Sequence, residues 1–336
     1  MPELSEPLIP EPDQCVGVIG FGKMGILHSG LLNLLNPGCV KFIVEKNRMV
    51  SLGASRLLKR IKFYGNTENM LKKEEPDIVY VTTPPSSHFN IVSTLLKAGI
   101  KMIFVEKPPT LNSEELETLI ELKEPEQCVL VGLQKRFSLP VRHARLLLSE
   151  KKLGELEEVT ASIRSSDVLE PTHRYTKIRR GVLLDLGIHV IDLLQWFLNV
   201  DRPIEASSDS FYTGIDDCFK AEISGEDDLK ISFTANWSDP AYRRPETLLE
   251  FIGTEGEIRV SEDYLKLNSR NQESFQIHLP HYYGGVPPVN LADPEYTLEN
   301  LHVLHAAMGG VEPITSLDKV RGTMMLVDEL YEKTPR

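Results

Sequence analysis

The sequence predicts two successive domains of different class, an α/β domain with a parallel sheet and then an α+β domain. From Cys15 to about Phe137, apolar runs alternate with helical patterns, as they do in right-handed βαβ units. Beyond that point strand-like runs follow one another with few helices between them, which indicates an antiparallel or mixed sheet. A chain of 336 residues is long enough for two hydrophobic cores.

The elements of the first domain follow from the apolar runs, which are mostly continuous rather than alternating, as in strands covered on both faces. We expect strands at Cys15–Ile19, Val40–Val44, Ile61–Tyr64, Ile78–Thr82, Met102–Val105 and Cys128–Leu133. We expect helices between them at Met24–Leu35, Val50–Lys59, Phe89–Ala98 and Ser113–Leu122.

The second domain is predicted to open with a helix at Leu139–Ser149 and to close with helices at Leu298–Met308 and Leu317–Glu332. A further helix is expected at about Gly187–Leu198. Turn-forming clusters separate the strand-like runs, which are Leu156–Arg164, Phe211–Thr213, Phe219–Ser224, Leu229–Ala235, Leu248–Ile252 and Glu257–Val260.

The composition is ordinary for a globular protein, with 41% hydrophobic and 26% charged residues. A net charge of −12 argues against nonspecific binding to nucleic acid or to anionic membranes. No apolar run approaches the length that crosses a bilayer. Residues 1–14 are acidic, hold four prolines and lack the pattern of a signal peptide. We expect them to form a flexible N-terminal arm, disordered or lying on a partner subunit.

The four cysteines, Cys15, Cys39, Cys128 and Cys218, form no CxxC pair. At least three of them lie in or beside apolar strand-like runs, which favours buried thiols in a reducing compartment. We therefore expect a cytoplasmic protein.

A glycine-rich turn, Gly20-Phe21-Gly22-Lys23-Met24-Gly25, lies between the first predicted strand and the first predicted helix. In this context Gly20 permits a tight turn, Gly22 lets a pyrophosphate approach the backbone, and Gly25 lets the helix pack closely on the strand. N–H groups at the helix start would face the phosphate. The turn predicts dinucleotide binding; the alternative is a turn that only tightens the corner between strand and helix.

Glu45 closes the second predicted strand, twenty residues after Gly25. A carboxylate at this position accepts both ribose hydroxyls of an adenosine, and its charge would repel a 2′-phosphate. The cofactor expected is therefore NAD. Lys46 and Arg48 follow and could reach a 2′-phosphate, which keeps NADP as the alternative.

Two further strands are followed by informative loops. Glu106-Lys107-Pro108-Pro109 comes directly after one predicted strand, at the sheet edge where a reactive lysine would meet a nicotinamide. Glu106 could hold either the lysine or a ribose hydroxyl, whereas a solvated lysine is the alternative. Thr83 and Pro84 begin a turn that could line the nucleotide site or simply start the next helix, with Ser86 or Ser87 as its N-cap.

Asp185, His189 and Asp192 lie four and three residues apart in an apolar segment. On a helix they fall on or near one face, and an imidazole in such a setting suits proton transfer near neutral pH. The alternative is that Asp185 caps the helix and that His189 is a hydrogen-bonded core residue. The other histidine pairs, His302 with His305 and His278 with His281, lack a partner at metal-ligand spacing, so we expect no metal.

These motifs together resemble the Gfo/Idh/MocA oxidoreductase family, which includes glucose–fructose oxidoreductase and inositol dehydrogenase. The resemblance extends over most of the chain through the glycine-rich turn, Thr83-Pro84-x-x-x-His88, Glu106-Lys107-Pro108, Gly132-Leu133-Gln134-Lys135-Arg136-Phe137, Asp185-x-Gly187-x-His189-x-x-Asp192 and Gly253-Thr254-x-Gly256. Pro85 and Gln134 stand where the family often has asparagine.

The resemblance implies a Rossmann domain with a doubly wound parallel sheet at 15–137. At 138–336 it implies an α+β domain with a large open, mostly antiparallel sheet that often forms subunit contacts, and hence a homo-oligomer, dimer or tetramer. It implies a nicotinamide cofactor and a sugar, cyclitol or related substrate. Lys107, Asp185 and His189 match the family's catalytic residues, and the substrate contacts expected beside them are Lys135 and Trp237. The expected cofactor contacts are Gly20, Phe21, Gly22, Lys23, Met24, Gly25, Glu45, Thr83, Pro84, His88, Glu106, Lys107 and Gln134.

The expected activity is hydride transfer between the nicotinamide and a secondary hydroxyl or ketone of a sugar, cyclitol or sugar derivative, including nucleotide-linked and amino sugars. Two alternatives stay open. One is a redox-neutral, NAD-dependent glycosidase of the same family, and the other is a non-catalytic nucleotide-sensing regulator on the same fold.

Overall fold

The computed structural model describes residues 14–171, 180–270, 274–278 and 294–335. They form two compact units, one with residues 14–132 and 294–320 and one with the remaining described residues from 133 to 335. The predicted arm at 1–14 lies outside the described residues apart from Gln14, whose side-chain amide donates to the Leu304 carbonyl.

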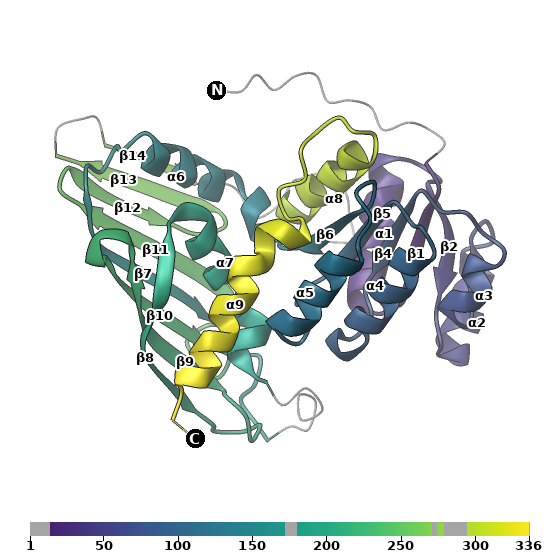
Figure 1. Cartoon of the computed structure of the whole chain (residues 1–336), viewed down its shortest axis with the longest axis horizontal. Helices are drawn as coiled ribbons and strands as arrows, with labels where there is room; N and C mark the ends of the chain where they lie inside the picture. Colours follow the sequence, from purple (N-terminus) through teal and green to yellow (C-terminus); the bar gives the residue numbers. More distant parts are fainter. Residues whose placement is uncertain (1–13, 172–179, 271–273, 279–293, 336) are drawn as a thin grey trace. The chain divides into compact units, whose positions relative to one another are not determined.

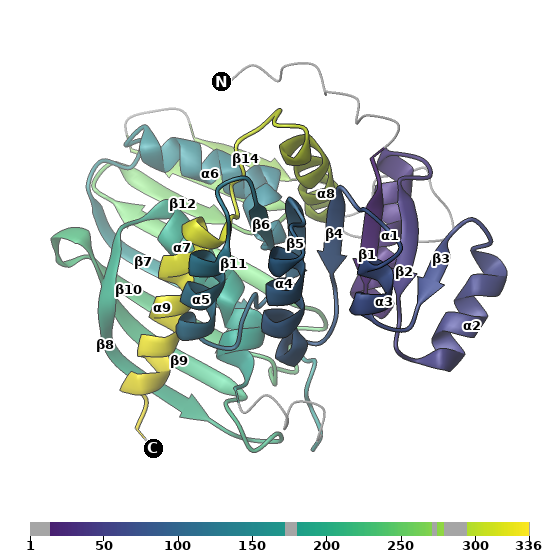
Figure 2. The same ribbon diagram turned by 45° about the vertical axis from the view of Figure 1, so that its right-hand side comes forward.

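The first unit contains a six-stranded sheet in the order β3-β2-β1-β4-β5-β6 (Figure 1; β3 is labelled in Figure 2). Every neighbouring pair is parallel, which confirms the predicted doubly wound sheet. The direction of winding reverses between β1 and β4, and ligands of such sheets bind beyond the strand ends at this switch point. The strands are β1 (Val16–Ile19), β2 (Val40–Val44), β3 (Lys62–Tyr64), β4 (Ile78–Val81), β5 (Met102–Glu106) and β6 (Cys128–Gly132).

The helices of this unit are close to their predicted bounds. They are α1 (Lys23–Leu35), α2 (Arg48–Leu57), α4 (His88–Lys97) and α5 (Ser113–Leu122). A short helix, α3 (Thr67–Leu71), was not predicted; its N-cap Asn66 accepts the Asn69 N–H group, but its single turn is too short for an apolar period.

A helix from the end of the chain completes the first core. α8 (Pro294–Ala307) contributes Val303 and Leu304 to the cluster that holds Val18, Tyr80 and Phe104. Residue Ser316 also bridges to Leu130 of β6. The predicted helix is therefore present, but its place in the first unit did not follow from its sequence.

The second unit contains an eight-stranded sheet in the order β14-β13-β12-β11-β7-β10-β9-β8. Only β7 and β10 pair in parallel, and the other neighbours are antiparallel, which confirms the predicted mostly antiparallel sheet. The strands are β7 (Leu156–Arg164), β8 (Val200–Asp209), β9 (Cys218–Gly225), β10 (Lys230–Asn236), β11 (Glu246–Gly253), β12 (Gly256–Val260), β13 (Tyr264–Ser269) and β14 (Phe275–His278).

One face of this sheet is apolar and carries helices. In β10 the side chains of Ile231, Phe233 and Ala235 are buried, whereas those between them are partly exposed, as the two-residue period of a strand requires. Helices α6 (Leu139–Ser149) and α7 (Ile188–Phe197) lie on the apolar side together with the C-terminal part of α9 (Leu317–Lys333) (Figure 2).

The prediction of a strand at Phe211–Thr213 was wrong. These residues form a loop whose backbone N–H groups donate to the Asp217 carboxylate instead of to a neighbouring strand. The edge strand before them, β8, escaped prediction because it is mostly exposed, contains Pro203 and lacks an apolar run. Of the histidine pair His278 and His281, His278 ends β14 and His281 lies outside the described residues.

Candidate active site

The glycine-rich turn connects β1 to α1. Gly20 has a φ of +94°, and a Cβ there would lie 2.9 Å from the Thr82 carbonyl oxygen. A Cβ on Gly25 would lie 2.0 Å from the Gly20 carbonyl oxygen, whereas one on Gly22 would meet nothing within 4 Å. Glycine is therefore required at two of the three positions, and the third faces open space.

Helix α1 starts at Lys23 with Gly22 at its N-cap, and no described side chain caps its first N–H groups. Those groups carry the positive end of the helix dipole and need an acceptor. The pyrophosphate of a dinucleotide would supply one, so the turn fits the predicted cofactor.

Glu45 ties this turn to the loop after β2. One carboxylate oxygen accepts the Phe21 N–H group at 2.9 Å, and the other accepts the Asn47 N–H group at 2.7 Å. Each carboxylate oxygen can accept more than one hydrogen bond, so Glu45 is held in place and still able to accept from a ribose. Lys46 and Arg48 are exposed beside it.

The turn after β4 is bound to the glycine-rich turn. The Thr82 hydroxyl donates to the Gly20 carbonyl at 2.8 Å. Pro84 precedes a short 3-10 helix, η1 (Pro85–Ser87), and the Ser87 hydroxyl bonds to Thr83 and Pro84. Ser87 occupies the N-cap position of α4, as one alternative expected, but its side chain makes no capping hydrogen bond.

His88, a predicted cofactor contact, is fully buried beneath this turn. Its two ring nitrogens lie 2.7 Å from the Thr83 carbonyl oxygen and 2.8 Å from the Pro108 carbonyl oxygen. Burial lowers the pKa of His88 below its ordinary value, while the two carbonyl contacts act in the opposite direction. The ring therefore lies between the loop after β4 and the loop after β5, and a neutral ring donates to only one of the two carbonyls.

Glu106 and Lys107 lie at the end of β5. Glu106 is 8% exposed; its carboxylate lies 2.9 Å from Nε2 of His28 and accepts the Lys107 N–H group at 3.1 Å. Lys107 is partly exposed, and the bond between it and Pro108 is cis. The first unit thus brings the glycine-rich turn, the Thr83-Pro84 turn and the Glu106-Lys107 segment to one edge of its sheet.

Asp185 and His189 lie in the second unit. Asp185 is part of a π-helical turn, η3 (Leu183–Gly187), that runs directly into α7. Asp185 is partly exposed and His189 is 4% exposed. The π-helical turn was not predicted; such turns are rare and often occur at functional sites.

Asp216 holds the start of this segment. Its carboxylate accepts the N–H groups of Gly181 at 2.7 Å and Leu183 at 2.9 Å, and the Tyr331 hydroxyl lies 3.1 Å away. Burial raises the pKa of Asp216, and burial together with Asp216 raises the pKa of Tyr331 well above its ordinary value. Sequence reasoning missed Asp216 because it lies thirty-one residues from Asp185 in a different strand connection.

Besides His189, three residues of the predicted site are buried in the second unit. Gln134 and Lys135 are 8% and 6% exposed, and Lys135 forms an ion pair with Glu262. The Trp237 indole is 1% exposed and donates to Asp217 at 2.6 Å. Packing and pairing account for these contacts, and the roles of the three residues toward cofactor and substrate stay predictions.

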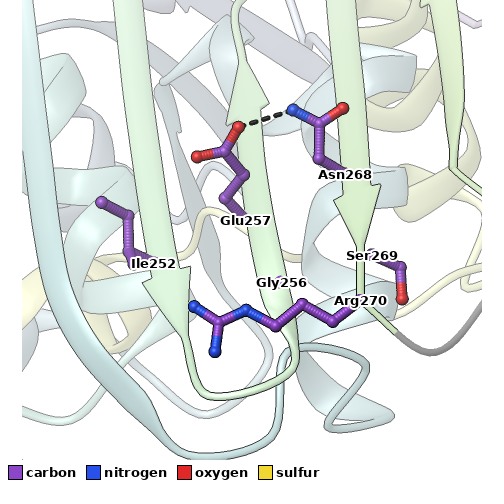
Figure 3. Close-up of a pocket in the computed structure, with 6 residues that line it drawn as sticks. All are labelled: Ile252, Gly256, Glu257, Asn268, Ser269 and Arg270. Atoms are coloured by element: carbon purple, nitrogen blue, oxygen red, sulfur yellow. Dashed lines mark hydrogen bonds between the residues drawn. The ribbon is translucent and has the colours of Figure 1, made fainter.

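The hollow formed by β11, β12 and β13 contains none of the predicted catalytic, cofactor or substrate residues (Figure 3). It is lined by Ile252, Gly256, Glu257, Asn268, Ser269 and Arg270. Among the described residues, no group of three or more histidine, cysteine or acidic side chains could hold a metal ion. No helix in the described part of the chain is long and apolar enough to span a bilayer.

The fold and the three strand-end loops define a dinucleotide-binding protein of the Rossmann class. Residues 15–133 match the family model described as an oxidoreductase family with an NAD-binding Rossmann fold, and residues 141–259 match the GFO/IDH/MocA C-terminal domain. The chain belongs to the Gfo/Idh/MocA family of oxidoreductases.

Among curated proteins, trans-1,2-dihydrobenzene-1,2-diol dehydrogenase of Xenopus tropicalis is 24% identical over 282 residues, 81% of this chain and 82% of the relative. Myo-inositol 2-dehydrogenase of Thermotoga maritima is 25% identical over 186 residues, 54% of each chain. Among solved structures, levoglucosan dehydrogenase with NADH and levoglucosan has a TM-score of 0.81 at 20% identity, covering 96% of this chain and 97% of its own. An Agrobacterium radiobacter oxidoreductase with NAD+, L-tartaric acid and magnesium has a TM-score of 0.82 at 19% identity, covering 96% of both chains.

Proposed function

We propose that this oxidoreductase is an NAD-dependent dehydrogenase of a secondary hydroxyl in a sugar, cyclitol or sugar derivative, acting reversibly on the matching ketone. The observation that carries the proposal is the edge of the first sheet. An uncapped helix N-terminus, a fixed carboxylate and a partly exposed lysine follow the ends of β1, β2 and β5 at this edge. The names of the relatives, dihydrodiol and inositol dehydrogenases, support the substrate class.

NAD would be held mainly by backbone and carboxylate groups. The N–H groups at the start of α1 would bind the pyrophosphate, Glu45 would accept the ribose hydroxyls, and the Thr83-Pro84 turn would line the site. The charge of Glu45 disfavours a 2′-phosphate, which is why NAD is proposed over NADP. The bound nicotinamide supplies the hydride acceptor.

In the oxidation direction His189 accepts the hydroxyl proton as the substrate carbon loses its hydride and the carbonyl forms. Lys107 donates a hydrogen bond to the same oxygen and stabilises its developing negative charge. Asp185 orients either the substrate or His189. In the reverse direction His189 returns the proton to the oxygen.

The test is a turnover assay with both cofactors across sugars, cyclitols and sugar nucleotides. Net formation of NADH supports the proposal. Turnover without a net change in NADH, with cofactor retained through purification, identifies a redox-neutral enzyme instead. Cofactor binding without turnover of any substrate indicates a nucleotide-sensing regulator.

We also propose a cytoplasmic location, a domain boundary at 137/138 and assembly into a homo-oligomer through the open face of the second sheet. All four cysteines are free thiols, which supports a reducing compartment. The open face presents short side chains such as Thr160, Ser162, Ser232 and Thr234 on adjoining strands. Analytical ultracentrifugation tests the assembly, and a monomer at all concentrations would contradict it.

A further inference from the structure

Two histidines of the first unit are fully buried, and both contact the segment that contains Lys107. His28 comes from α1 and His88 from the first turn of α4. Burying a polar ring is costly unless its nitrogens are hydrogen-bonded. The hydrogen-bond partners of the two rings therefore indicate which parts of the chain each histidine fixes in place.

His28 acts on Lys107 through Glu106. Nε2 of His28 lies 2.9 Å from one Glu106 oxygen, and the other Glu106 oxygen accepts the Lys107 N–H group at 3.1 Å. The ring is fixed by aromatic neighbours, with centroids 4.9 Å from Phe104 and 5.5 Å from Tyr80. The carboxylate therefore joins a rigid imidazole to the backbone of the lysine.

Asn300 of α8 supports the other side of the His28 ring. Nδ1 of His28 lies 3.1 Å from the amide oxygen and 3.0 Å from the amide nitrogen of Asn300. The amide can thus accept from Nδ1 or donate to it. Nε2 of His28 is consequently able to donate to Glu106 whether the ring is neutral or protonated.

His88 acts on the other side of Lys107. Its Nδ1 lies 2.8 Å from the Pro108 carbonyl oxygen and its Nε2 lies 2.7 Å from the Thr83 carbonyl oxygen. The ring lies between the residue after Lys107 and the turn after β4, and it donates to one of these two carbonyls when neutral and to both when protonated. The backbone of Lys107 is thus held from both of its chain neighbours, by His28 through Glu106 and by His88 through Pro108.

We propose that His28 and His88 are positioning residues for Lys107, which rests on the proposed function of that lysine. A lysine side chain is flexible and has four carbons between its backbone and its charge. Its ammonium group is placed reproducibly only when its backbone is fixed. A displacement of about 1 Å in a reacting group lowers turnover by about a hundredfold.

Hydrogen–deuterium exchange at the Lys107 amide tests the positioning without using activity. His28→Phe and His88→Phe each keep a ring of similar shape and remove the hydrogen bonds. We expect exchange to be faster by about tenfold or more, since each change loosens a support of this segment. The matched control is His143→Phe, because His143 lies in the second unit with its ring stacked on Phe275.

Turnover and cofactor affinity complete the test. We expect both variants to lose about ten- to a hundredfold in kcat while the Kd for NAD changes little. His28→Gln, which keeps a donor toward Glu106, should recover most of the loss. If either Phe variant fails to fold, Asn300→Ala and His88→Leu replace them with the same expectations.

Exchange at Lys107 no faster than in His143→Phe contradicts the inference, as does faster exchange with unchanged kcat. Lys107→Ala, measured alongside, separates this inference from the proposed function. If that variant keeps normal turnover, the proposed role of Lys107 is wrong, and the exchange rates alone decide whether the two histidines hold the segment.

Discussion

Arg136 and Asp192 form a bidentate ion pair that is almost completely buried. Nε of Arg136 lies 2.7 Å from one carboxylate oxygen of Asp192 and Nη2 lies 2.6 Å from the other. Their side chains are 3% and 1% exposed, and the Thr323 hydroxyl donates to the same carboxylate. Asp192 is therefore tied into the framework of the second unit, although its spacing had grouped it with Asp185 and His189.

Arg136→Ala should destabilise the protein by about 3–5 kcal/mol, because it leaves the Asp192 carboxylate buried without its cationic partner. Urea unfolding measures the difference. Lys151→Ala is the control, since Lys151 and Glu155 form an exposed pair whose loss should have little effect. An equal loss of stability in the two variants would contradict the prediction, because it would show that the buried ion pair contributes no more to stability than the exposed one.

The contribution of His88 to the stability of the folded protein should decrease as the pH falls, because its pKa is lowered in the folded state. Burial lowers the pKa of His88 in the folded protein below its ordinary value of 6.5. Below pH 6.5 the unfolded chain then binds more protons at this position, so its contribution to stability decreases as the pH falls. The advantage of the wild type over His88→Phe should be smaller at about pH 5.5 than at about pH 8. A larger advantage at low pH would mean that the protonated ring, donating to both carbonyls, is the favoured form.

Glu45 should set the preference for NAD over NADP. Its carboxylate is held by the N–H groups of Phe21 and Asn47, so it cannot move away from a 2′-phosphate without losing both bonds. We expect NAD to bind at least tenfold more tightly, about 1.4 kcal/mol, and Glu45→Ala to reduce that ratio. Titration of both proteins with both cofactors measures it. Tighter binding of NADP by the wild type would contradict this prediction and would indicate that Lys46 or Arg48 binds the 2′-phosphate.

His189 should act as the proton acceptor of the oxidation. A general base contributes about 10²–10⁴-fold, so His189→Ala should lose activity on that scale. The loss should decrease as the pH rises, because hydroxide increasingly replaces the missing base. The pH–rate profiles of the two proteins measure this. If the variant keeps the acidic limb of the wild-type pH–rate profile and nearly the wild-type rate, His189 is a packed core residue and not the proton acceptor.

The strands of the first sheet could be predicted because continuous apolar runs and the glycine-rich turn are local signals. The position of α8 could not, since Val303 and Leu304 show an apolar face without showing what it packs against. The π-helical turn around Asp185 could not be predicted for a similar reason. The N–H groups at the start of its segment donate to Asp216, which comes from a loop distant in the sequence.

The candidate site shows the same division. Residue types and spacing identified Glu45, Lys107 and His189 as candidates. Glu45 and Lys107 come at the ends of predicted strands, and His189 comes near the start of a predicted helix. His28 carried no such signal, since a histidine within a predicted helix gives no indication of its partner. Its contact with Glu106 depends on the packing of α1 against the end of β5.

The measurement that tests the central claim most directly is NADH formation by the purified protein from NAD+ and a panel of sugars, cyclitols and sugar nucleotides. Wild-type protein should form NADH with at least one of them. Lys107→Ala should bind NAD with little change but lose most of its turnover, because a charged donor to the reacting oxygen acts mainly in the transition state. No NADH from any of these substrates, or normal turnover by Lys107→Ala, would contradict this account.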